Sequence, residues 1–125
     1  MSKTLKVYIA GKITDNPNYK EDFAAGAAAV LERIRFTYGR KLPVTLMLPS
    51  SEPLGLSNRH YMRISMDRID EADIIAMLPN FEESRGAKIE ELYGIYTGKQ
   101  LLYITQPEFE AAGGRKETED NEGDR

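Results

Sequence analysis

Short apolar runs alternate with longer segments of helical periodicity along most of the chain. Each run is followed within two residues by Gly or Pro, and such bounded runs predict strands. The longest of them, 74–78, is apolar throughout and indicates a central strand buried on both faces. The predicted strands are 6–10, 44–48, 74–78 and 101–105.

The segments between the runs repeat apolar residues every three or four positions, which predicts helices with one face toward a core. The first helix begins near Tyr19, the second near Asn58 as a capping residue, and the third near Ser84 with Gly98 as its C-terminal cap. The stripe of the third helix predicted to face the core is Ile89, Leu92, Tyr93 and Tyr96.

Regular alternation of strand and helix predicts an α/β fold of three layers. We expect a mostly parallel sheet of four to five strands with helices on both faces, as in flavodoxin- and Rossmann-like folds, joined by right-handed crossovers. Ligands of such sheets bind at the carboxyl ends of the strands. The loops after Ile9, Leu48 and Leu78 and the start of the third helix are therefore the places to look for a site.

Composition fits one globular domain, 1–110, followed by an acidic tail, 111–125, that we expect to be disordered because it holds almost no apolar residue from Gly113 onward. The absence of cysteine excludes disulfides, thiolate metal sites and thiol nucleophiles. The net charge of −3 and the scattered basic residues argue against a nucleic acid polymer as partner. No segment resembles a signal peptide or a membrane span, so a cytoplasmic protein with no membrane partner is expected.

Glu90 is the strongest candidate for chemistry. It lies four residues after Gly86 and four before Gly94, so the three share one helical face on which the glycines predict open space. Glu90 is also near the start of its helix, where the macrodipole favours an ionised carboxylate. An ionised carboxylate is the nucleophile that a positively charged, oxocarbenium-like transition state needs. The alternative for Glu90 is an ordinary helix glutamate exposed to solvent. We interpret its neighbour Glu91 in that way.

Two further segments lie on the same predicted edge. Tyr8 stands near the end of the first strand, and Gly11 after it lets a ligand approach the backbone; the alternative for Tyr8 is a packed core residue. The segment 61–73 carries several acids, with Asp67 as the candidate general acid and an ordinary polar helix face as the alternative. His60, the sole histidine, lacks the partners of a triad or a metal site, and no metal or cofactor is expected.

In order, these segments resemble the nucleoside 2-deoxyribosyltransferase superfamily over about residues 5–105, most closely its small, largely uncharacterised branch found in phages and prophages (DUF4406-like). The resemblance lies in the opening Tyr-x-x-Gly, in the strand after Asp73, and in the spacing Ser-x-Gly-x-x-x-Glu that ends at Glu90. It implies that Glu90 is the nucleophile and that Tyr8 orients it. It also implies a small nucleoside or nucleotide as partner and a homo-oligomer. The positions it marks as substrate-binding are Gly11, Ser65, Asp73, Ser84 and Gly86.

One departure from the family pattern bears on activity. The family usually has an aspartate eight positions before the strand-opening aspartate, where this chain has Ser65, and Asp67 is about 200° away around an ideal helix. Ser84 matches a serine that contacts the 5′-phosphate in nucleotide-hydrolysing members. The resemblance therefore leaves two functions open: N-glycosidic bond cleavage or base transfer on a deoxynucleoside or its monophosphate, or a nucleotide-binding module without turnover. A protein-interaction domain that uses the acidic tail is a third.

Overall fold

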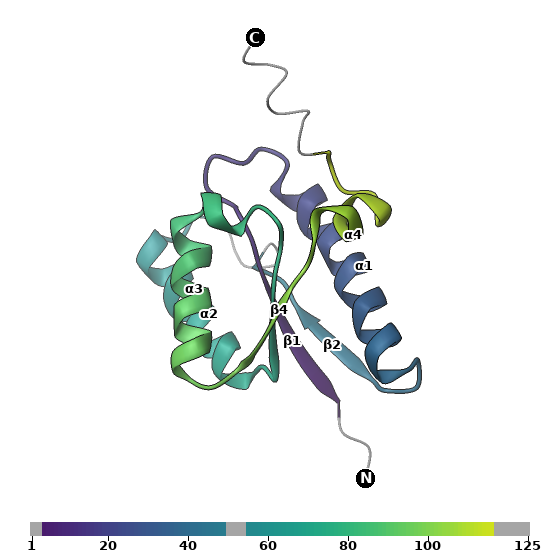
Figure 1. Ribbon diagram of the computed structural model, residues 1–125. Coiled ribbons are helices and arrows are strands. Elements are labelled where there is room, and N and C mark those ends of the chain that lie inside the picture. Colours follow the sequence, from purple (N-terminus) through teal and green to yellow (C-terminus); the bar gives the residue numbers. More distant parts are fainter. Residues whose placement is uncertain (1–3, 50–54, 117–125) are drawn as a thin grey trace.

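A sheet of four parallel strands lies at the centre of the molecule (Figure 1). The computed structural model describes residues 4–49 and 55–116. The strand order is β2-β1-β3-β4, and all three neighbouring pairs are parallel. The predicted α/β class and the parallel sheet are therefore confirmed, with four strands among the described residues. Their bounds are β1 Leu5–Ala10, β2 Val44–Met47, β3 Ile74–Met77 and β4 Gln100–Tyr103.

Helices cover both faces of the sheet, two on each (Figure 1). α1 (Tyr19–Tyr38) and α4 (Gln106–Ala111) lie on one face. α2 (Asn58–Glu71) and α3 (Arg85–Tyr96) lie on the other. Successive strand residues point to opposite faces, so Val7 and Ile9 pack toward α1 whereas Tyr8 packs in the layer of α2 and α3. The period of the strand therefore decides which layer receives the tyrosine hydroxyl.

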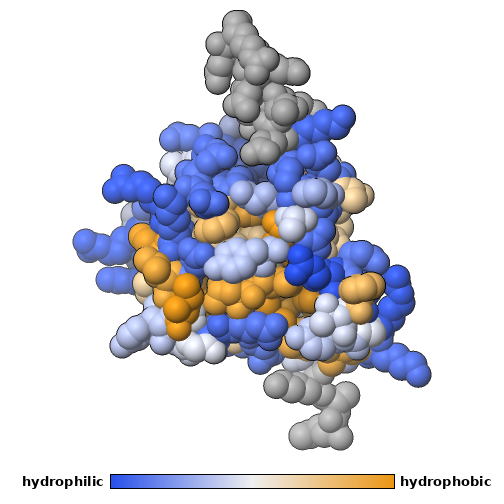
Figure 2. All heavy atoms as spheres, viewed as in Figure 1, coloured by the Kyte–Doolittle hydropathy of each residue, from blue (hydrophilic) through white to orange (hydrophobic). Residues whose placement is uncertain are grey.

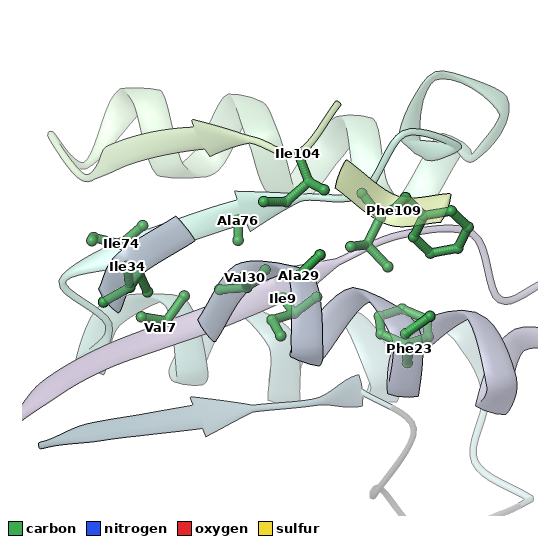
Figure 3. Packing of buried hydrophobic residues seen from close by; sticks show 12 residues of the cluster. Val7, Ile9, Phe23, Ala29, Val30, Ile34, Ile74, Ala76, Ile104 and Phe109 are labelled. Atoms are coloured by element: carbon green, nitrogen blue, oxygen red, sulfur yellow. The ribbon is translucent and has the colours of Figure 1, made fainter. Parts of the chain in front are cut away.

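The larger part of the apolar core lies between α1 and the sheet (Figure 3). The large side chains that α1 buries in it, Phe23, Val30 and Ile34, share one helical face, as the sequence periodicity predicted. Short α4 closes one end of this core with Phe109, which is 6% exposed. The residues labelled in Figure 3 are Val7, Ile9, Phe23, Ala29, Val30, Ile34, Ile74, Ala76, Ile104 and Phe109.

The connections diverge between β1 and β3. The chain leaves β1 through α1 to reach β2 on one side, and then returns through α2 to β3 on the other side of β1. This arrangement is a topological switch point, and the crevice outside the carboxyl ends of two such strands is the usual ligand site of open α/β sheets. The loop 11–18 after β1 and the short helix η2 (Phe81–Glu83) after β3 border this crevice.

The orientation predicted for the third helix is wrong for three of its four stripe residues. Ile89, Leu92 and Tyr96 are exposed, whereas Tyr93 is partly buried and packs against the core. The buried residues of α3 are Ala87, Glu90 and Gly94. The reason is that α3 lies very close to the sheet at Gly94. A Cβ built on Gly94 would lie 2.2 Å from Cδ1 of Ile75 in β3. Small residues on the inner face let the helix lie close to the sheet, and the large apolar residues are left outside.

The predicted disorder from residue 111 is also wrong for the part of the tail that the structure describes. Ala111 is the last residue of α4, and Ala112 packs against the core. Arg115 donates to both carboxylate oxygens of Asp22, at 3.0 and 2.8 Å, and Asp22 lies in the first turn of α1. The ordered fold thus extends at least to residue 116, and the remaining tail residues, 117–125, lie outside the described residues.

Candidate functional site

Three side chains from three different elements meet in the layer between the sheet and helices α2 and α3. The hydroxyl of Tyr8 on β1 lies 2.7 Å from Oε2 of Glu90 on α3 and 3.0 Å from Oγ of Ser65 on α2. A tyrosine hydroxyl carries one proton, and an ionised carboxylate is a stronger acceptor than a neutral serine hydroxyl. We therefore assign the Tyr8 proton to Glu90.

Burial dominates the electrostatics of this cluster. Glu90 is 6% exposed, Ser65 9% and Tyr8 1%. Burial raises the pKa of Glu90 because it disfavours the charged carboxylate, and hydrogen bonds with Tyr8 and Ser65 lower the pKa by a smaller amount. The net direction is upward, which differs from the fully ionised carboxylate that the helix position alone predicts. A buried carboxylate held by hydroxyl groups is a common feature of catalytic sites.

The backbone of α3 explains why Glu90 reaches Tyr8. Gly94 packs one turn further along the same face and is in contact distance of Ile75 and Leu101, so it is a packing position and not the open wall that the sequence predicted. Gly86 differs, because a Cβ there would have ordinary contacts only, 3.7 Å to Cε of Met62 and 3.9 Å to Oγ of Ser84. Of the two glycines on the face of Glu90, only Gly86 therefore has room for an added methyl group.

Ser84 begins α3 as its N-terminal cap. Its side chain accepts a hydrogen bond from the backbone N–H of Ala87 at 3.1 Å. The hydroxyl proton is not used in that bond, so Ser84 retains a donor at the start of the helix. Its position six residues before Glu90 places it about two turns from the carboxylate along the same helix.

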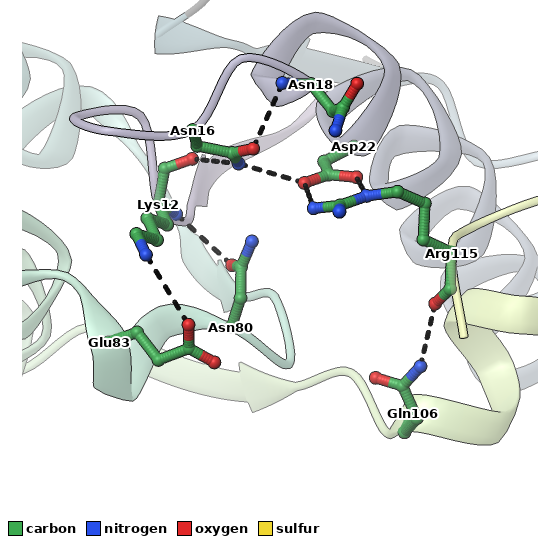
Figure 4. A network of polar contacts seen from close by, with 8 residues as sticks. All are labelled: Lys12, Asn16, Asn18, Asp22, Asn80, Glu83, Gln106 and Arg115. Atoms are coloured by element: carbon green, nitrogen blue, oxygen red, sulfur yellow. Dashed lines mark hydrogen bonds and ion pairs between the residues drawn. The ribbon is translucent and has the colours of Figure 1, made fainter. Parts of the chain in front are cut away.

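Gly11 follows β1 at the switch point. A Cβ on Gly11 would lie 3.1 Å from Cδ1 of Leu78 and 3.2 Å from Oδ1 of Asn80, so the loops after β1 and β3 approach each other closely here. The side chain of Asn80 accepts a hydrogen bond from the backbone N–H of Lys12 at 3.2 Å and ties the two loops together (Figure 4). The sequence analysis did not single out Asn80. The feature that could have identified it is its position just after a buried strand, at the carboxyl edge of the sheet.

A cavity of about 320 Å³ opens at this switch point. Lys12 and Glu83 face each other across it at 3.5 Å (Figure 4). On the side of α1, Asn16 donates to Asp22, whose carboxylate is 2% exposed. The cavity is lined by Lys12, Asp15, Asn16, Pro17, Asn18, Asn80, Glu83 and Arg115, so none of the Tyr8–Ser65–Glu90 cluster lines it.

Arg115 and Asn16 stabilise the ionised carboxylate of Asp22. Burial raises the pKa of this carboxyl, but hydrogen bonds from Arg115 and Asn16 together with the Arg115 charge outweigh burial, and the net direction is downward. Arg115 and Asp22 are 93 positions apart in sequence. No local pattern connects them, and the sequence analysis missed both.

Two predicted acids do not join the cluster around Glu90. Asp73 precedes β3 at the amino end of the sheet, where its carboxylate accepts from the backbone N–H of Lys6 at 2.9 Å. This edge is opposite to the one that Gly11 and Ser84 occupy. Asp67 is exposed on α2, and its charge contributes to a raised pKa of Tyr93, for which a hydrogen bond to Asp70 is the largest cause. Asp67 and Ser65 point to different sides of α2, as the helical angle predicted.

His60 lies in the first turn of α2, where Nδ1 is 3.3 Å from Oγ of Ser57, and both side chains are exposed. Among residues 4–49 and 55–116, no three His, Asp or Glu side chains are grouped to hold a metal ion. Within these same ranges, no helix is both long and apolar enough to cross a membrane.

The fold of this α/β protein is similar to that of a solved 2-desoxiribosyltransferase from Leishmania mexicana. The TM-score is 0.58 at 21% sequence identity, and the match covers 82% of this chain and 65% of that chain. This chain therefore spans about two thirds of the length of that enzyme, and at this identity the likeness establishes the fold alone.

The chain belongs to the family described as a domain of unknown function (DUF4406), whose model matches residues 5–103. The matched residues include Tyr8, Ser65 and Glu90. No curated protein matches the sequence.

Proposed function

We propose that this protein cleaves or transfers the N-glycosidic bond of a 2′-deoxynucleoside or its 5′-monophosphate, with Glu90 as the nucleophile. The observation that supports it most is the 2.7 Å contact of Tyr8 with a carboxylate that is 6% exposed. An ordinary surface glutamate has neither this burial nor such a partner. Charged side chains are seldom buried unless other groups bind them. The similarity of the fold to a 2-desoxiribosyltransferase supports the same reaction class.

In the proposed reaction, Tyr8 holds Oε2 of Glu90, and Oε1 attacks C1′ of the sugar. The bond from C1′ to the base nitrogen breaks, its electron pair leaves with the base, and the base takes up a proton from solvent. A water molecule or a second base then attacks C1′ and loses a proton to solvent, the bond from C1′ to Oε1 breaks, and the carboxylate of Glu90 is released. A covalent intermediate of this kind is typical of a carboxylate nucleophile at an anomeric carbon.

Tyr8 and Ser65 act on Glu90 in this proposal. Their hydroxyl groups lower the pKa of Glu90 and so favour the ionised carboxylate that burial disfavours. Ser84, whose hydroxyl proton is unused by its capping bond, is the group that we propose for a 5′-phosphate. Gly86 would leave room for the sugar, and Gly11 would let the ligand approach the backbone of the switch-point loop.

A nucleotide-binding module without turnover is the second candidate, and Ser65 favours it. The carboxylate cluster contains Ser65 at the position where the family that this chain resembles usually has an aspartate. The nearest other aspartate on α2, Asp67, is exposed to solvent. Such a module would bind the nucleotide and release no base. A cytoplasmic location and assembly into a homo-oligomer remain predictions.

The test is incubation of the protein with a panel of deoxynucleosides and their monophosphates, followed by chromatography for free base. Glu90→Gln keeps the size and much of the hydrogen bonding but removes the nucleophile, so base release should fall by several orders of magnitude while a nucleotide still raises the Tm. Glu91→Gln is the matched control, because the half-buried Glu91 accepts a hydrogen bond from the hydroxyl of Tyr103 on β4 and is not part of the Tyr8–Ser65–Glu90 cluster.

Three outcomes of this test are distinct. Base release that Glu90→Gln abolishes supports the enzyme. A nucleotide-dependent rise in Tm without base release indicates the binding module. If Glu90→Gln keeps more than about a tenth of the wild-type rate, a loss below about 1.4 kcal/mol, Glu90 is not the nucleophile.

A further inference from the structure

The chain continues past α4 in a short segment, residues 113–116, that folds back onto this helix. We call it the strap. The backbone N–H of Gly114 donates to the carbonyl of Phe109 at 2.8 Å, and a Cβ on Gly114 would lie 2.3 Å from Cδ2 of the Phe109 ring. Gln106 donates to the carbonyl of Arg115 at 2.9 Å (Figure 4). These contacts fix the backbone that carries the Arg115 side chain.

The Arg115 side chain connects the strap to the first turn of α1. It donates to both carboxylate oxygens of Asp22, and this carboxylate is 2% exposed. Figure 2, viewed as in Figure 1, shows a mainly hydrophilic surface at the end of the molecule where loop 11–18 and α4 lie. The connection between the strap and α1 is therefore polar and depends on one buried ion pair.

Asp22 extends this connection to the loop 11–18 through Asn16. Asn16 is 8% exposed, and its Nδ2 donates to Asp22 and to the backbone carbonyl of Lys12, both at 2.9 Å (Figure 4). Its Oδ1 accepts from the backbone N–H of Asn18 at 3.1 Å. Both protons of this buried amide group are thus used. A continuous chain of contacts runs from the strap to the loop that borders the switch point.

The backbone of this loop needs such support. Asp15 has a φ of 59°, and it is the only non-glycine residue with a positive φ in the part of the chain that the structure describes. A residue in this region of φ persists where the surrounding contacts fix it. Asp15, Asn16 and Arg115 all line the cavity of about 320 Å³ at the switch point. The conformation of the loop therefore determines the shape of the cavity.

We propose that Arg115 and Asp22 are positioning residues for this loop: the docked strap holds loop 11–18 in the conformation that shapes the cavity. Without Arg115, the buried carboxylate of Asp22 would keep one amide donor, and a buried charge without a partner charge is strongly unfavourable. Opening of the loop would let water reach this carboxylate. The consequence for ligands rests on the proposed function, in which Gly11 of the loop approaches the substrate.

Hydrogen exchange of the full chain tests the positioning role without any ligand. In Arg115→Met, the backbone amides of Asn16 and Asn18 should exchange at least about tenfold faster than in Ile69→Val. Ile69→Val is the matched control, because Ile69 is fully buried on α2, on the other face of the sheet, and its shortening weakens the fold without touching the loop. Loop amides that exchange no faster in Arg115→Met than in Ile69→Val overturn the proposal.

A double variant separates the charge of Asp22 from its contact with the loop. Asp22→Asn keeps an oxygen that can accept from Asn16 but has no charge that needs Arg115. Combined with Arg115→Met, it should slow the exchange of the loop amides toward the wild-type rate, because replacement of both partners leaves no unpaired buried charge. A double variant whose loop exchanges as fast as that of Arg115→Met alone contradicts the proposal.

A second measurement uses a deoxynucleoside monophosphate as the probe. Arg115→Met should raise KM, or Kd in a protein without turnover, by about tenfold and leave kcat within about twofold, since Arg115 lies outside the Tyr8–Ser65–Glu90 cluster. A fall in kcat with an unchanged KM would overturn the positioning role. If the wild-type protein neither binds nor cleaves any nucleotide, the proposed function fails, and the exchange measurement still decides whether the strap positions the loop.

Discussion

Gly94 offers the sharpest test of how α3 is held against the sheet. Gly94→Ala adds one methyl group, and its ideal position lies 2.2 Å from Cδ1 of Ile75, which is fully buried. Ordinary carbon contacts are about 3.5–4.0 Å, so the overlap exceeds 1 Å and either the isoleucine or the helix must move. If the helix moves outward, the carboxylate of Glu90, one turn earlier on the same face, moves away from Tyr8.

Two opposing free energies set the size of the effect. Overpacking of a buried site costs about 1–3 kcal/mol, and replacement of glycine by alanine within a helix contributes about 1 kcal/mol in the other direction. We therefore expect a net destabilisation of up to about 2 kcal/mol, with Tm falling by about 4 °C for each kcal/mol in a domain of this size.

Ile75→Val is designed to relieve the clash. It removes Cδ1, and the next atoms around the new methyl group, Cγ1 of Ile75 at 3.5 Å and Cδ2 of Leu101 at 3.9 Å, are at ordinary contact distance. Alone it should cost about 0.5–1.5 kcal/mol, but combined with Gly94→Ala the total should be at least 1 kcal/mol less than the sum of the two.

The assay is urea unfolding of the two single variants and the double variant. Gly86→Ala serves as the control, because its methyl group would meet no atom closer than 3.7 Å and should not lower the stability. The close-packing account of α3 fails if Gly94→Ala is more stable than the wild type by about 1 kcal/mol, which is the gain from helix propensity alone, or if the coupling to Ile75→Val is below about 0.5 kcal/mol.

Three further predictions concern pH. Burial raises the pKa of Glu90 above 4.5, so ionisation of this carboxyl lowers the stability of the fold as the pH rises through the folded-state pKa. Glu90→Gln should therefore raise the Tm, and by more at about pH 8 than at about pH 5. The net lowered pKa of Asp22 means that the Asp22–Arg115 pair stabilises the fold above pH 3.8 and less as the pH falls through the folded value; Arg115→Met should cost about 2 kcal/mol near neutral pH by urea unfolding, and equal stability of the two proteins there would refute it. Arg33 lowers the pKa of Glu108 to about 2, so the stability lost in Arg33→Met should shrink as the pH is taken from 4.5 toward 2.

The sequence alone determined the order and type of the four strands and of the three helices between them, but not the last helix, α4. Apolar runs bounded by Gly or Pro gave the four strands, since a buried strand needs apolar residues on both faces and a breaker at its end. The spacing from Ser84 to Glu90 and the tyrosine in the first strand singled out two members of the carboxylate cluster, because both features are local or match a known motif. These inferences need only short stretches of chain.

Only the tertiary structure decided which faces and which distant residues meet. Ser65 joins Tyr8 across 57 positions, and Arg115 pairs with Asp22 across 93, so no local pattern specifies either contact. The orientation of α3 was decided by Gly94, because close packing against Ile75 requires a small residue inside, whereas a hydrophobicity pattern selects the largest apolar residues for the core. A periodic apolar stripe therefore does not by itself show which face of a helix packs on the chain's own sheet.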